Sequence, residues 1–408
     1  MQLLHKALQE ELGELPGDIF AQLLSEKLNA RGLKLSRREI QLLQKRILSG
    51  ESRTLHLRRW RWWERQCIDL EFTDHEMQEF EHRLTRDISE MLPQVIDTMA
   101  GELATCILAT LKRNWCRELQ RPSRERASFQ RRLFRRWGVS LGLLRMLVTI
   151  SREYGASMNQ ELRESAAAQS PHLVESLTRL HARACQVVEE ILVLLTAGFA
   201  DGAMARWRTL HEIAVIALFI GEHGEELAER YVLHQYVESR RAAQDYVACQ
   251  KRLGYEALDP GKVASVERSY EAVVARFGRA FGTQYGWAAQ QLGIDKPLFT
   301  DIERAAGIEH FRAQYRMASH NVHANPKGVF FKLGLLKEKN LLLAGPSNAG
   351  LADPGHGAAI SLVQTSTPLA LLHPTLDNIV ILRIMVELER ETGQAFGDAH
   401  QRLVNDAA

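Results

Sequence analysis

The sequence predicts an all-α protein, and three observations lead to that prediction. Helix-forming residues dominate the chain, and apolar residues recur three and four positions apart over long stretches. Proline is rare until late in the chain, so few of these stretches are interrupted. The chain is 45% hydrophobic and 25% charged, a composition that can bury a globular core. We therefore expect a helical N-terminal region and a larger helical bundle.

The first 120 residues are expected to form a basic helical domain. Leucines recur at helical spacing from Leu3 to Leu12, and one long helical pattern covers residues 74–119. Pro93 lies inside that pattern and should break or kink the helix. Residues 121–137 are rich in arginine and contain the segment RPSRERAS, which we interpret as a linker between two domains.

Residues 138–408 are expected to form the larger helical bundle. Ser170 followed by Pro171 is typical of a helix start, and helical patterns continue from there as far as residue 322. A Gly- and Pro-rich loop insertion follows at residues 324–356. Within it, VFFKL and NLLLA predict a small hairpin. A final helical stretch, interrupted near Pro374, runs from about residue 358 to 390.

Composition and targeting signals favour a cytoplasmic protein. The five cysteines are odd in number and none are spaced as CxxC, so neither a disulfide framework nor a thiolate zinc site is indicated. The N-terminal sequence lacks the apolar core of a signal peptide, and no apolar stretch has the length of a membrane span. We expect no membrane association. The net charge of +2 indicates no polyanion partner by itself.

Several motifs that bind cofactors or mark common enzymes are absent. The chain contains no GxxxxGK[ST] loop, no GxGxxG after a strand, no HExxH and no GxSxG elbow. GPSNAG at residues 345–350 has the wrong spacing for a nucleophile elbow and reads as a turn. The sequence therefore predicts no cofactor.

Basic and aromatic residues cluster in the N-terminal third of the chain. Residues 57–66 interleave tryptophan with arginine, and residues 112–136 contain ten basic residues against two acidic ones. Cations bind phosphate and flat rings stack on bases, so the pattern predicts contact with RNA or another nucleic acid. The alternative is that the tryptophans anchor a core and the arginines form a solvated face. The candidate nucleic-acid-binding residues are Arg58, Arg59, Trp60, Arg61, Trp62, Arg131, Arg132, Arg135 and Arg136.

Two segments combine arginine with histidine at short spacing. In RWRTLHE, Arg206 precedes His211 by five positions. On a helix, Arg208, His211 and Glu212 share one face. The alternative to a functional site is an ion pair between Arg208 and Glu212 on a central helix.

The second segment is YRMASHNVHANPKG at residues 315–328. Arg316 precedes His323 by two helical turns, with Ser319, His320 and Asn321 between them. Cleavage of RNA without a metal needs a base, a proton donor and a cation, which histidine and arginine supply. A metal site at His320 and His323 lacks a third ligand, so we expect no metal. The alternative is a helix-capping polar cluster that holds the following loop.

We expect the two segments to meet inside the bundle. Such a meeting would gather several polar groups in an otherwise apolar core, where polar groups are costly unless they are paired. The residues expected to converge are Arg208, Glu212, His234, Arg316, His320 and His323.

The stretch from about residue 195 to 385 resembles a bacterial family known as domain of unknown function 5677. The resemblance rests on GFADGAMARWRTLHE, ERYVLH, YGWA, YRMASHNVHA and GPSNAGLADP, and it implies no particular reaction. A looser likeness is to the HEPN superfamily, whose helical domains often carry an R-x4–6-H motif. That likeness implies either a metal-independent RNase of toxin and phage-defence systems or a binding module without activity. Arg206 with His211 and Arg316 with His323 both satisfy the spacing.

These observations leave three hypotheses. The first is an RNA endonuclease acting as a toxin or phage-defence effector, with Arg316 and His323, or Arg206 and His211, as catalytic groups. The second is a non-catalytic helical module that binds nucleic acid, a partner protein or a second copy of the chain. The third is a small-molecule enzyme that uses the glycine-rich loop at 344–357 as a lid.

Overall fold

The computed structural model describes most of the chain, in two compact units. Contacts divide the chain into Met1–Pro122 and Ser123–Ala408. Helices dominate both units, so the predicted all-α class is confirmed. The residues described are 13, 15–30, 40, 54–61, 64–165, 169–323, 325–336 and 341–406, with only the backbone described at 54–61, 64–70 and 163–165.

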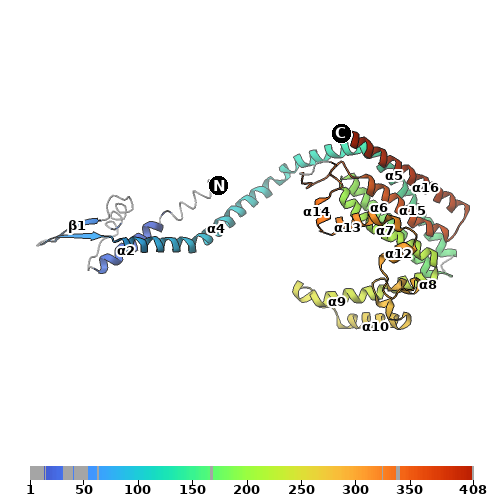
Figure 1. Cartoon of the computed structure of the whole chain (residues 1–408), viewed down its shortest axis with the longest axis horizontal. Coiled ribbons are helices and arrows are strands. Elements are labelled where there is room, and N and C mark those ends of the chain that lie inside the picture. Colours follow the sequence, from blue (N-terminus) through green and yellow to red (C-terminus); the bar gives the residue numbers. More distant parts are fainter. Residues whose placement is uncertain are drawn as a thin grey trace. The chain divides into compact units, whose positions relative to one another are not determined.

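The N-terminal unit has a small core beside a long helix. Helix α2 (Leu15–Ala30) packs on the first turns of α4 (Asp74–Glu118). Phe20, Leu24, Leu28, Phe72 and Phe80 form this core. A capping box between Thr73 and Glu76 starts α4, because the Thr73 hydroxyl accepts from the Glu76 amide and the Glu76 carboxylate accepts from the Thr73 amide. Helix α4 continues through Pro93 without a break, and Figure 1 shows it bending along its length.

An antiparallel hairpin is the one β element in the described part of the chain. Strand β1 (Thr54–Arg61) pairs with β2 (Glu64–Glu71), and the register places Leu55 opposite Leu70 and Leu57 opposite Ile68. The hairpin predicted in the glycine-rich insertion was wrong. VFFKL begins inside helix α14 (Pro326–Phe330), and residues 341–344 of NLLLA form no strand.

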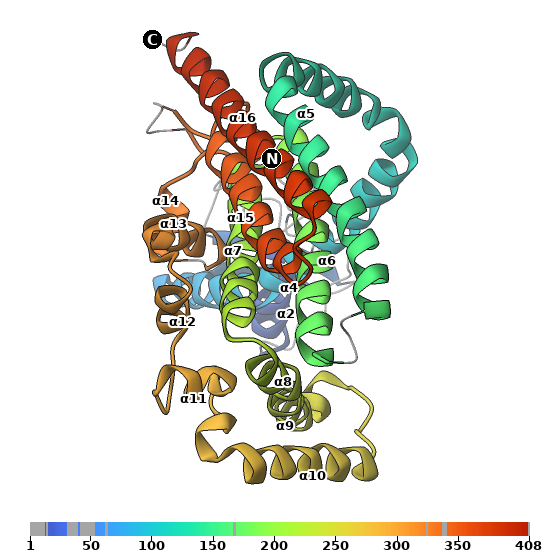
Figure 2. The same cartoon turned by 90° about the vertical axis from the view of Figure 1, so that its right-hand side faces the viewer.

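The C-terminal unit is built around five long helices. They are α5 (Gln120–Ser165), α6 (Pro171–Thr196), α7 (Ala200–His223), α15 (Ala352–Leu371) and α16 (Leu376–Asp406). Figure 2 shows them alongside one another, with α7 and α15 both packed against α6. Their apolar sides share one core, in which Trp137, Trp207 and Phe396 are buried. Helix α6 begins with Ser170 as its N-cap and Pro171 in its first turn, as predicted.

The arginine-rich segment 121–137, which we interpret from sequence as a linker between domains, is helical, and the boundary between the two units falls at its start, between Pro122 and Ser123. Helix α5 runs through it, and Leu133 and Trp137 are fully buried in the core of the C-terminal unit. Arg131 and Arg135 lie on the exposed side of the same helix. The segment is therefore an amphipathic helix with one buried and one exposed face. Its buried apolar positions are few, so the arginines dominate its composition.

Short elements connect α7 to the glycine-rich insertion. They are α8 (Glu225–Leu233), α9 (Gln235–Leu253), α10 (Pro260–Phe277), the 3-10 turns Arg279–Gly282 and Gly286–Ala288, α11 (Ala289–Leu292), α12 (Phe299–Ala305), the 3-10 turn Glu309–Phe311 and α13 (Arg312–Val322). Helices α9 and α10 pair as an arm at one end of the unit (Figure 2). Helices α12 and α13 pack on α7, which places the second arginine–histidine segment beside the first.

None of the helices in the described ranges has the length and apolar character needed to cross a membrane.

Candidate functional site

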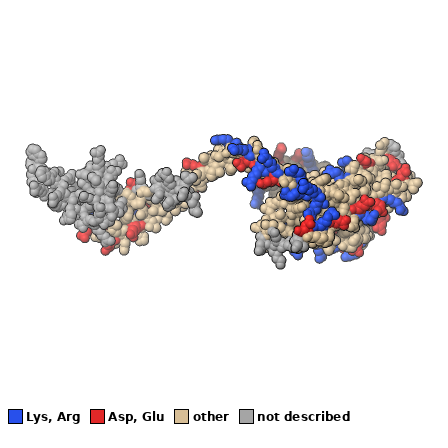
Figure 3. Space-filling view, turned by 90° about the horizontal axis from the view of Figure 1, so that it is seen from above, with Lys and Arg blue, Asp and Glu red and all other residues tan. Residues whose placement is uncertain are grey.

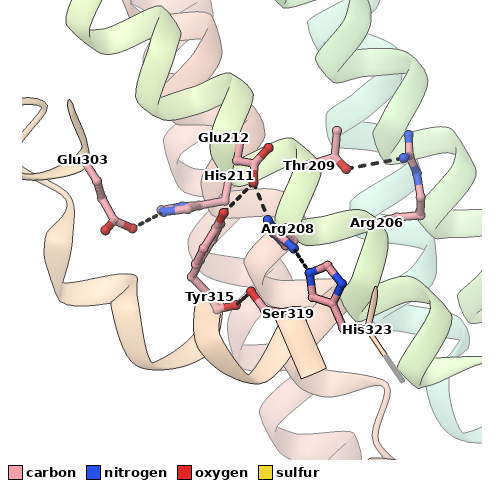
Figure 4. A network of polar contacts seen from close by, with 9 residues as sticks. All are labelled: Arg206, Arg208, Thr209, His211, Glu212, Glu303, Tyr315, Ser319 and His323. Atoms are coloured by element: carbon pink, nitrogen blue, oxygen red, sulfur yellow. Dashed lines mark hydrogen bonds and ion pairs between the residues drawn. The ribbon is translucent and has the colours of Figure 1, made fainter. Parts of the chain in front are cut away.

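A chain of polar contacts joins α7 to the end of α13 (Figure 4). Arg208 donates from Nε to Oε1 of Glu212, 3.1 Å away, and from Nη1 to Nε2 of His323, 3.4 Å away. The Tyr315 hydroxyl donates to the same Glu212 oxygen at 2.5 Å. The guanidinium carbon of Arg208 also lies 5.0 Å from the centre of the Tyr315 ring. Two side chains therefore hold Arg208 in a fixed orientation that points toward His323.

The charges in this network favour a cationic Arg208, which donates to the neighbouring imidazole of His323. Burial opposes the charge on Arg208, but hydrogen bonds with Tyr315 and Glu212 and the negative charge of Glu212 outweigh it, so the pKa of Arg208 is raised. Burial and the hydrogen bond to Glu212 raise the pKa of Tyr315, which keeps its proton. Because a guanidinium only donates, Nε2 of His323 must accept with its lone pair. The His323 side chain is exposed, so a substrate can reach it.

In the first arginine–histidine segment, by contrast, the histidine is buried. His211 is 0% exposed, and its Nε2 lies 2.9 Å from Oε1 of Glu303, which is also 0% exposed. The other Glu303 oxygen lies 2.8 Å from Nη2 of Arg312. A carboxylate only accepts, so His211 carries its proton on Nε2. Burial lowers the pKa of His211, although the Glu303 carboxylate acts in the opposite direction.

Aromatic rings surround this histidine and separate it from solvent. The ring centres of Trp207, Phe299, Phe311 and Tyr315 lie within 6.5 Å of the His211 imidazole. A substrate cannot contact an imidazole enclosed in this way without local unfolding. The geometry therefore favours a structural role for His211.

Arg206 makes contacts that lead away from His211. Its Nη2 lies 2.6 Å from Oε2 of Glu190, and its Nη1 donates to the Thr209 hydroxyl at 3.4 Å. Figure 4 shows Arg206 pointing away from the histidine. The two residues satisfy the R-x4-H spacing in sequence but do not form a common site in space.

Of the remaining predicted residues of α13, Arg316 faces solvent and His320 lies beside the residue that caps α14. Arg316 is exposed and makes no ion pair or hydrogen bond within the described part of the chain. The Asn325 amide donates from Nδ2 to Nδ1 of His320 at 2.9 Å, and Oδ1 of Asn325 caps α14 by accepting from the Gly328 amide. The Ser319 hydroxyl donates to the Tyr315 carbonyl. Asn325 is thus the cap of α14, and His320 supports it as a neighbouring acceptor.

Asn321 and His234 lie outside the polar network. Asn321 is half-buried and has no polar partner among the described residues. His234 is 5% exposed, and its Nε2 donates to the Thr283 carbonyl at 3.0 Å. It lines a different pocket of about 760 Å³, together with Tyr231 and Trp287. The expected convergence therefore includes Arg208, Glu212 and His323 but not His234.

The predicted nucleic-acid-binding residues are described only in part. Arg131 and Arg135 are exposed on α5 without a polar partner in the described ranges, whereas Arg132 donates to the Ser128 hydroxyl and Arg136 pairs with Asp406. Figure 3 shows Lys and Arg gathered over this part of the C-terminal unit. The side chains of Arg58, Arg59, Trp60 and Arg61, and the whole of Trp62, lie outside the described residues.

Sequence reasoning missed three residues that organise the site. Tyr315, Glu303 and Arg312 were not selected, although Tyr315 lies within the recognised YRMASHNVHA segment. The only local signal was the spacing of Tyr315 one turn before Ser319 on the same helical face. Within the described residues, no three His, Cys, Asp or Glu side chains gather as a metal site would require.

One comparison with known proteins gives a match, and it covers part of the C-terminal unit. Residues 175–340 match the sequence model described as "Family of unknown function (DUF5677)". The matched stretch contains α7, α12 and α13, and so includes His211, Glu303, Tyr315 and His323. No curated protein and no solved structure matches the chain.

Proposed function

We propose that the chain is a metal-independent RNA endonuclease of the HEPN type. His323 is the acid/base group and Arg208 is the cation that binds the scissile phosphate. One observation carries the proposal: the exposed imidazole of His323 lies 3.4 Å from the guanidinium of Arg208. An exposed base beside a held cation is the arrangement that cleavage of RNA at a 2′-hydroxyl requires.

The residues supply each step of this reaction. When Arg208 turns its Nη1 donor from His323 to the phosphate, Nε2 of His323 is free to accept the 2′-hydroxyl proton, and the resulting oxygen attacks the neighbouring phosphorus. Arg208 binds the non-bridging oxygens, on which negative charge grows. Because Glu212 and Tyr315 already orient Arg208, little reorganisation is needed when the substrate binds. The products are a 2′,3′-cyclic phosphate and a free 5′-hydroxyl.

The leaving 5′-oxygen takes its proton from water, and we assign to His320 the hydrogen bond that stabilises this oxygen as it leaves. Its Nδ1 accepts from the Asn325 amide, so a neutral His320 carries its proton on Nε2. Arg316, exposed and without a polar partner in the described ranges, supplies a second cation for the RNA backbone.

The likeness to HEPN domains also supports a proposal for the role of the protein in the cell. We propose that the protein acts in the cytoplasm as a bacterial toxin or phage-defence effector, which limits growth by cutting RNA. Expression of the wild type should slow growth of a bacterial host, and His323→Ala should remove that effect. Equal growth inhibition by both forms would contradict this extension while leaving the test in vitro open.

A second candidate function is a non-catalytic module that binds nucleic acid. The observation in its favour is the exposed arginine face of α5, where Arg131 and Arg135 have no partner in the described part of the chain. This function uses phosphate contacts alone and makes no demand on His323. A docking partner protein, or a second copy of the chain, would be a variant of the same function.

Incubation of labelled RNA with the purified protein in EDTA separates the two functions. We expect cleavage by the wild type and a loss of roughly 10²–10⁴-fold in His323→Ala, the usual contribution of an acid/base group. His310→Ala is the matched control, because His310 is also an exposed histidine of this unit and lies outside the network. Unchanged melting temperatures would show that both variants fold.

Three outcomes are informative. Cleavage that is lost in His323→Ala and retained in His310→Ala supports the endonuclease. Full cleavage by His323→Ala overturns the assignment of the base. Salt-sensitive RNA binding without any cleavage moves the conclusion to the binding module.

A further inference from the structure

A positively charged pocket lies between α5, α16 and the loop that contains GPSNAG. Its volume is about 420 Å³, which is enough for a phosphate with an attached sugar. The polar side chains that line it come from three segments far apart in the sequence. They are Arg132, Arg135, Arg136, Asn348, Arg402 and Asp406.

The pocket has many more donors than acceptors. Four guanidinium groups face a single carboxylate, Asp406, which lies 2.7 Å from Nη2 of Arg136. Nε and Nη1 of Arg136 are buried and have no hydrogen-bond partner in the described part of the chain. Arg135 and Arg402 are exposed and likewise have no polar partner among the described residues. Guanidinium groups cannot accept, so the exposed donors of Arg135 and Arg402 are open to an added acceptor such as an oxyanion, which would replace water there.

Asn348 adds a neutral donor in a fixed orientation. The Trp137 indole donates from Nε1 to both the backbone carbonyl and Oδ1 of Asn348, each 3.1 Å away. Since Oδ1 already accepts from the indole, the amide nitrogen of Asn348 is left as the free polar group of this side chain. Trp137 is 0% exposed, so the indole that holds Asn348 is itself fixed in the core.

The loop that carries Asn348 is held at both ends. The Ser347 amide donates to the Gly198 carbonyl, and the Ser347 hydroxyl donates to the Gly334 carbonyl. Gly350 has φ +78°, and a Cβ there would lie 2.3 Å from the carbonyl oxygen of Leu333. The loop therefore behaves as a rigid wall of the pocket, and its donor needs no reordering before a ligand binds.

We propose that this pocket binds a phosphate group. Arginine favours phosphate because its planar fork makes paired, charge-assisted hydrogen bonds to the oxygens. Several such forks around one small cavity suit a tetrahedral oxyanion better than they suit a neutral ligand. The phosphate is either free, as in inorganic phosphate, or part of an RNA chain. The pocket shares no residue with the proposed cleavage site, so the inference does not rest on that proposal.

The test measures stabilisation of the full-length protein by inorganic phosphate. The melting temperature is recorded against phosphate concentration, with chloride added to keep the ionic strength constant. We expect a saturable increase for the wild type, and an apparent affinity at least about tenfold weaker in Arg135→Gln/Arg402→Gln. Asp406→Asn should bind phosphate more tightly, because it removes the carboxylate that pairs with Arg136 in the pocket.

The matched control is Arg145→Gln/Arg252→Gln, which removes two exposed arginines of the same unit outside the pocket. This control should bind phosphate as the wild type does. A phosphate effect no larger than that of chloride would overturn the proposal. An equal loss of affinity in the control and pocket variants would also overturn it, since it would indicate a general charge effect.

Two RNA probes identify the source of the phosphate, measured by anisotropy in the His323→Ala background so that cleavage cannot interfere. If the pocket holds a backbone phosphate, an oligonucleotide with a 5′-hydroxyl end should lose affinity in the pocket variant. If it holds a terminal or free phosphate, only the 5′-phosphorylated oligonucleotide should lose affinity. Unchanged binding of both probes, together with no response to inorganic phosphate, would exclude the pocket as a phosphate site.

Discussion

The two arginine–histidine segments have similar spacing in sequence and opposite environments in space. His211 is enclosed by aromatic rings and paired with a buried glutamate, whereas His323 is exposed beside Arg208. The arginine that precedes each histidine in sequence does not contact it, because Arg206 pairs with Glu190 and Arg316 extends into solvent. Spacing alone therefore does not identify which arginine contacts which histidine. Burial and the contacts in the folded protein distinguish the two segments.

The buried histidine has a structural consequence of its own. His211 on α7, Glu303 on α12 and Arg312 on α13 connect three helices through one carboxylate. A buried charge of this kind contributes little net stability while it is paired, but the loss of one partner leaves an uncompensated charge. The comparison thus predicts opposite phenotypes for the two histidines.

The largest expected effect is on stability. His211→Ala should lower the free energy of unfolding of the C-terminal unit by roughly 3–5 kcal/mol, since it opens a cavity and leaves Glu303 with one partner. His323→Ala should change it by less than about 0.5 kcal/mol, because its side chain is exposed. Urea denaturation followed by circular dichroism measures both values. Similar losses in the two variants would contradict the contrast between a buried and an exposed histidine.

Much of the fold is predictable from the sequence because it depends on local patterns. The apolar periodicity of α6 and α7 and the Ser170–Pro171 helix start both appear in the structure. The arginine-rich stretch 121–137 was interpreted as a linker because of its arginine content. Two of its apolar residues, Leu133 and Trp137, anchor it in the core. The hairpin Thr54–Glu71 was missed because its alternating leucines lie among arginines and tryptophans that suggested a different role.

The candidate site was less predictable because its contacts are not local. The ion pair of Arg208 and Glu212 spans one helical turn and could be predicted from spacing. The hydrogen bond between Tyr315 and Glu212 spans 103 residues, and that between His211 and Glu303 spans 92. No periodicity connects such positions, so their pairing follows only from how α12 and α13 pack on α7.

The next largest effect is the dependence of protein stability on pH, which we expect the buried histidines to cause. Burial lowers the pKa of His181 to about 4, and the ring's partners Ser151, Ser366 and Cys185 carry no compensating carboxylate. The unfolded chain binds a proton near pH 6.5, so protonation favours unfolding between these values. Stability should therefore fall by up to about 3 kcal/mol as the pH drops from 6.5 toward 4. The lowered pKa of His211 acts in the same direction.

Urea midpoints measured between pH 7.5 and 5 test this dependence. His181→Gln keeps a polar group near Ser151 but cannot take up a proton, so its stability should decrease less with falling pH. His323→Ala serves as the control and should retain the steep pH dependence of the wild type. A His181→Gln protein with an unchanged slope would indicate that other groups cause the loss.

The smallest expected effect tests whether Tyr315 holds Arg208 in position. Tyr315→Phe keeps the ring beside the guanidinium but removes the hydroxyl that donates to Glu212 at 2.5 Å. We expect a loss of about 1 kcal/mol in stability, the usual contribution of one hydrogen bond. RNA cleavage should fall about tenfold with little change in RNA affinity, because the cation remains but is less well oriented. Single-turnover kinetics separate the two quantities.

Tyr246→Phe provides the matched control for that variant. Tyr246 also donates a hydroxyl hydrogen bond, to the Glu256 carbonyl, but it lies on α9 and has no contact with Arg208. It should lose a similar or smaller amount of stability and none of the cleavage activity. If both tyrosine variants cleave RNA at the wild-type rate, Arg208 does not depend on Tyr315 for its orientation. The exposed pair of Arg208 and His323 would then have to be held by Glu212 alone.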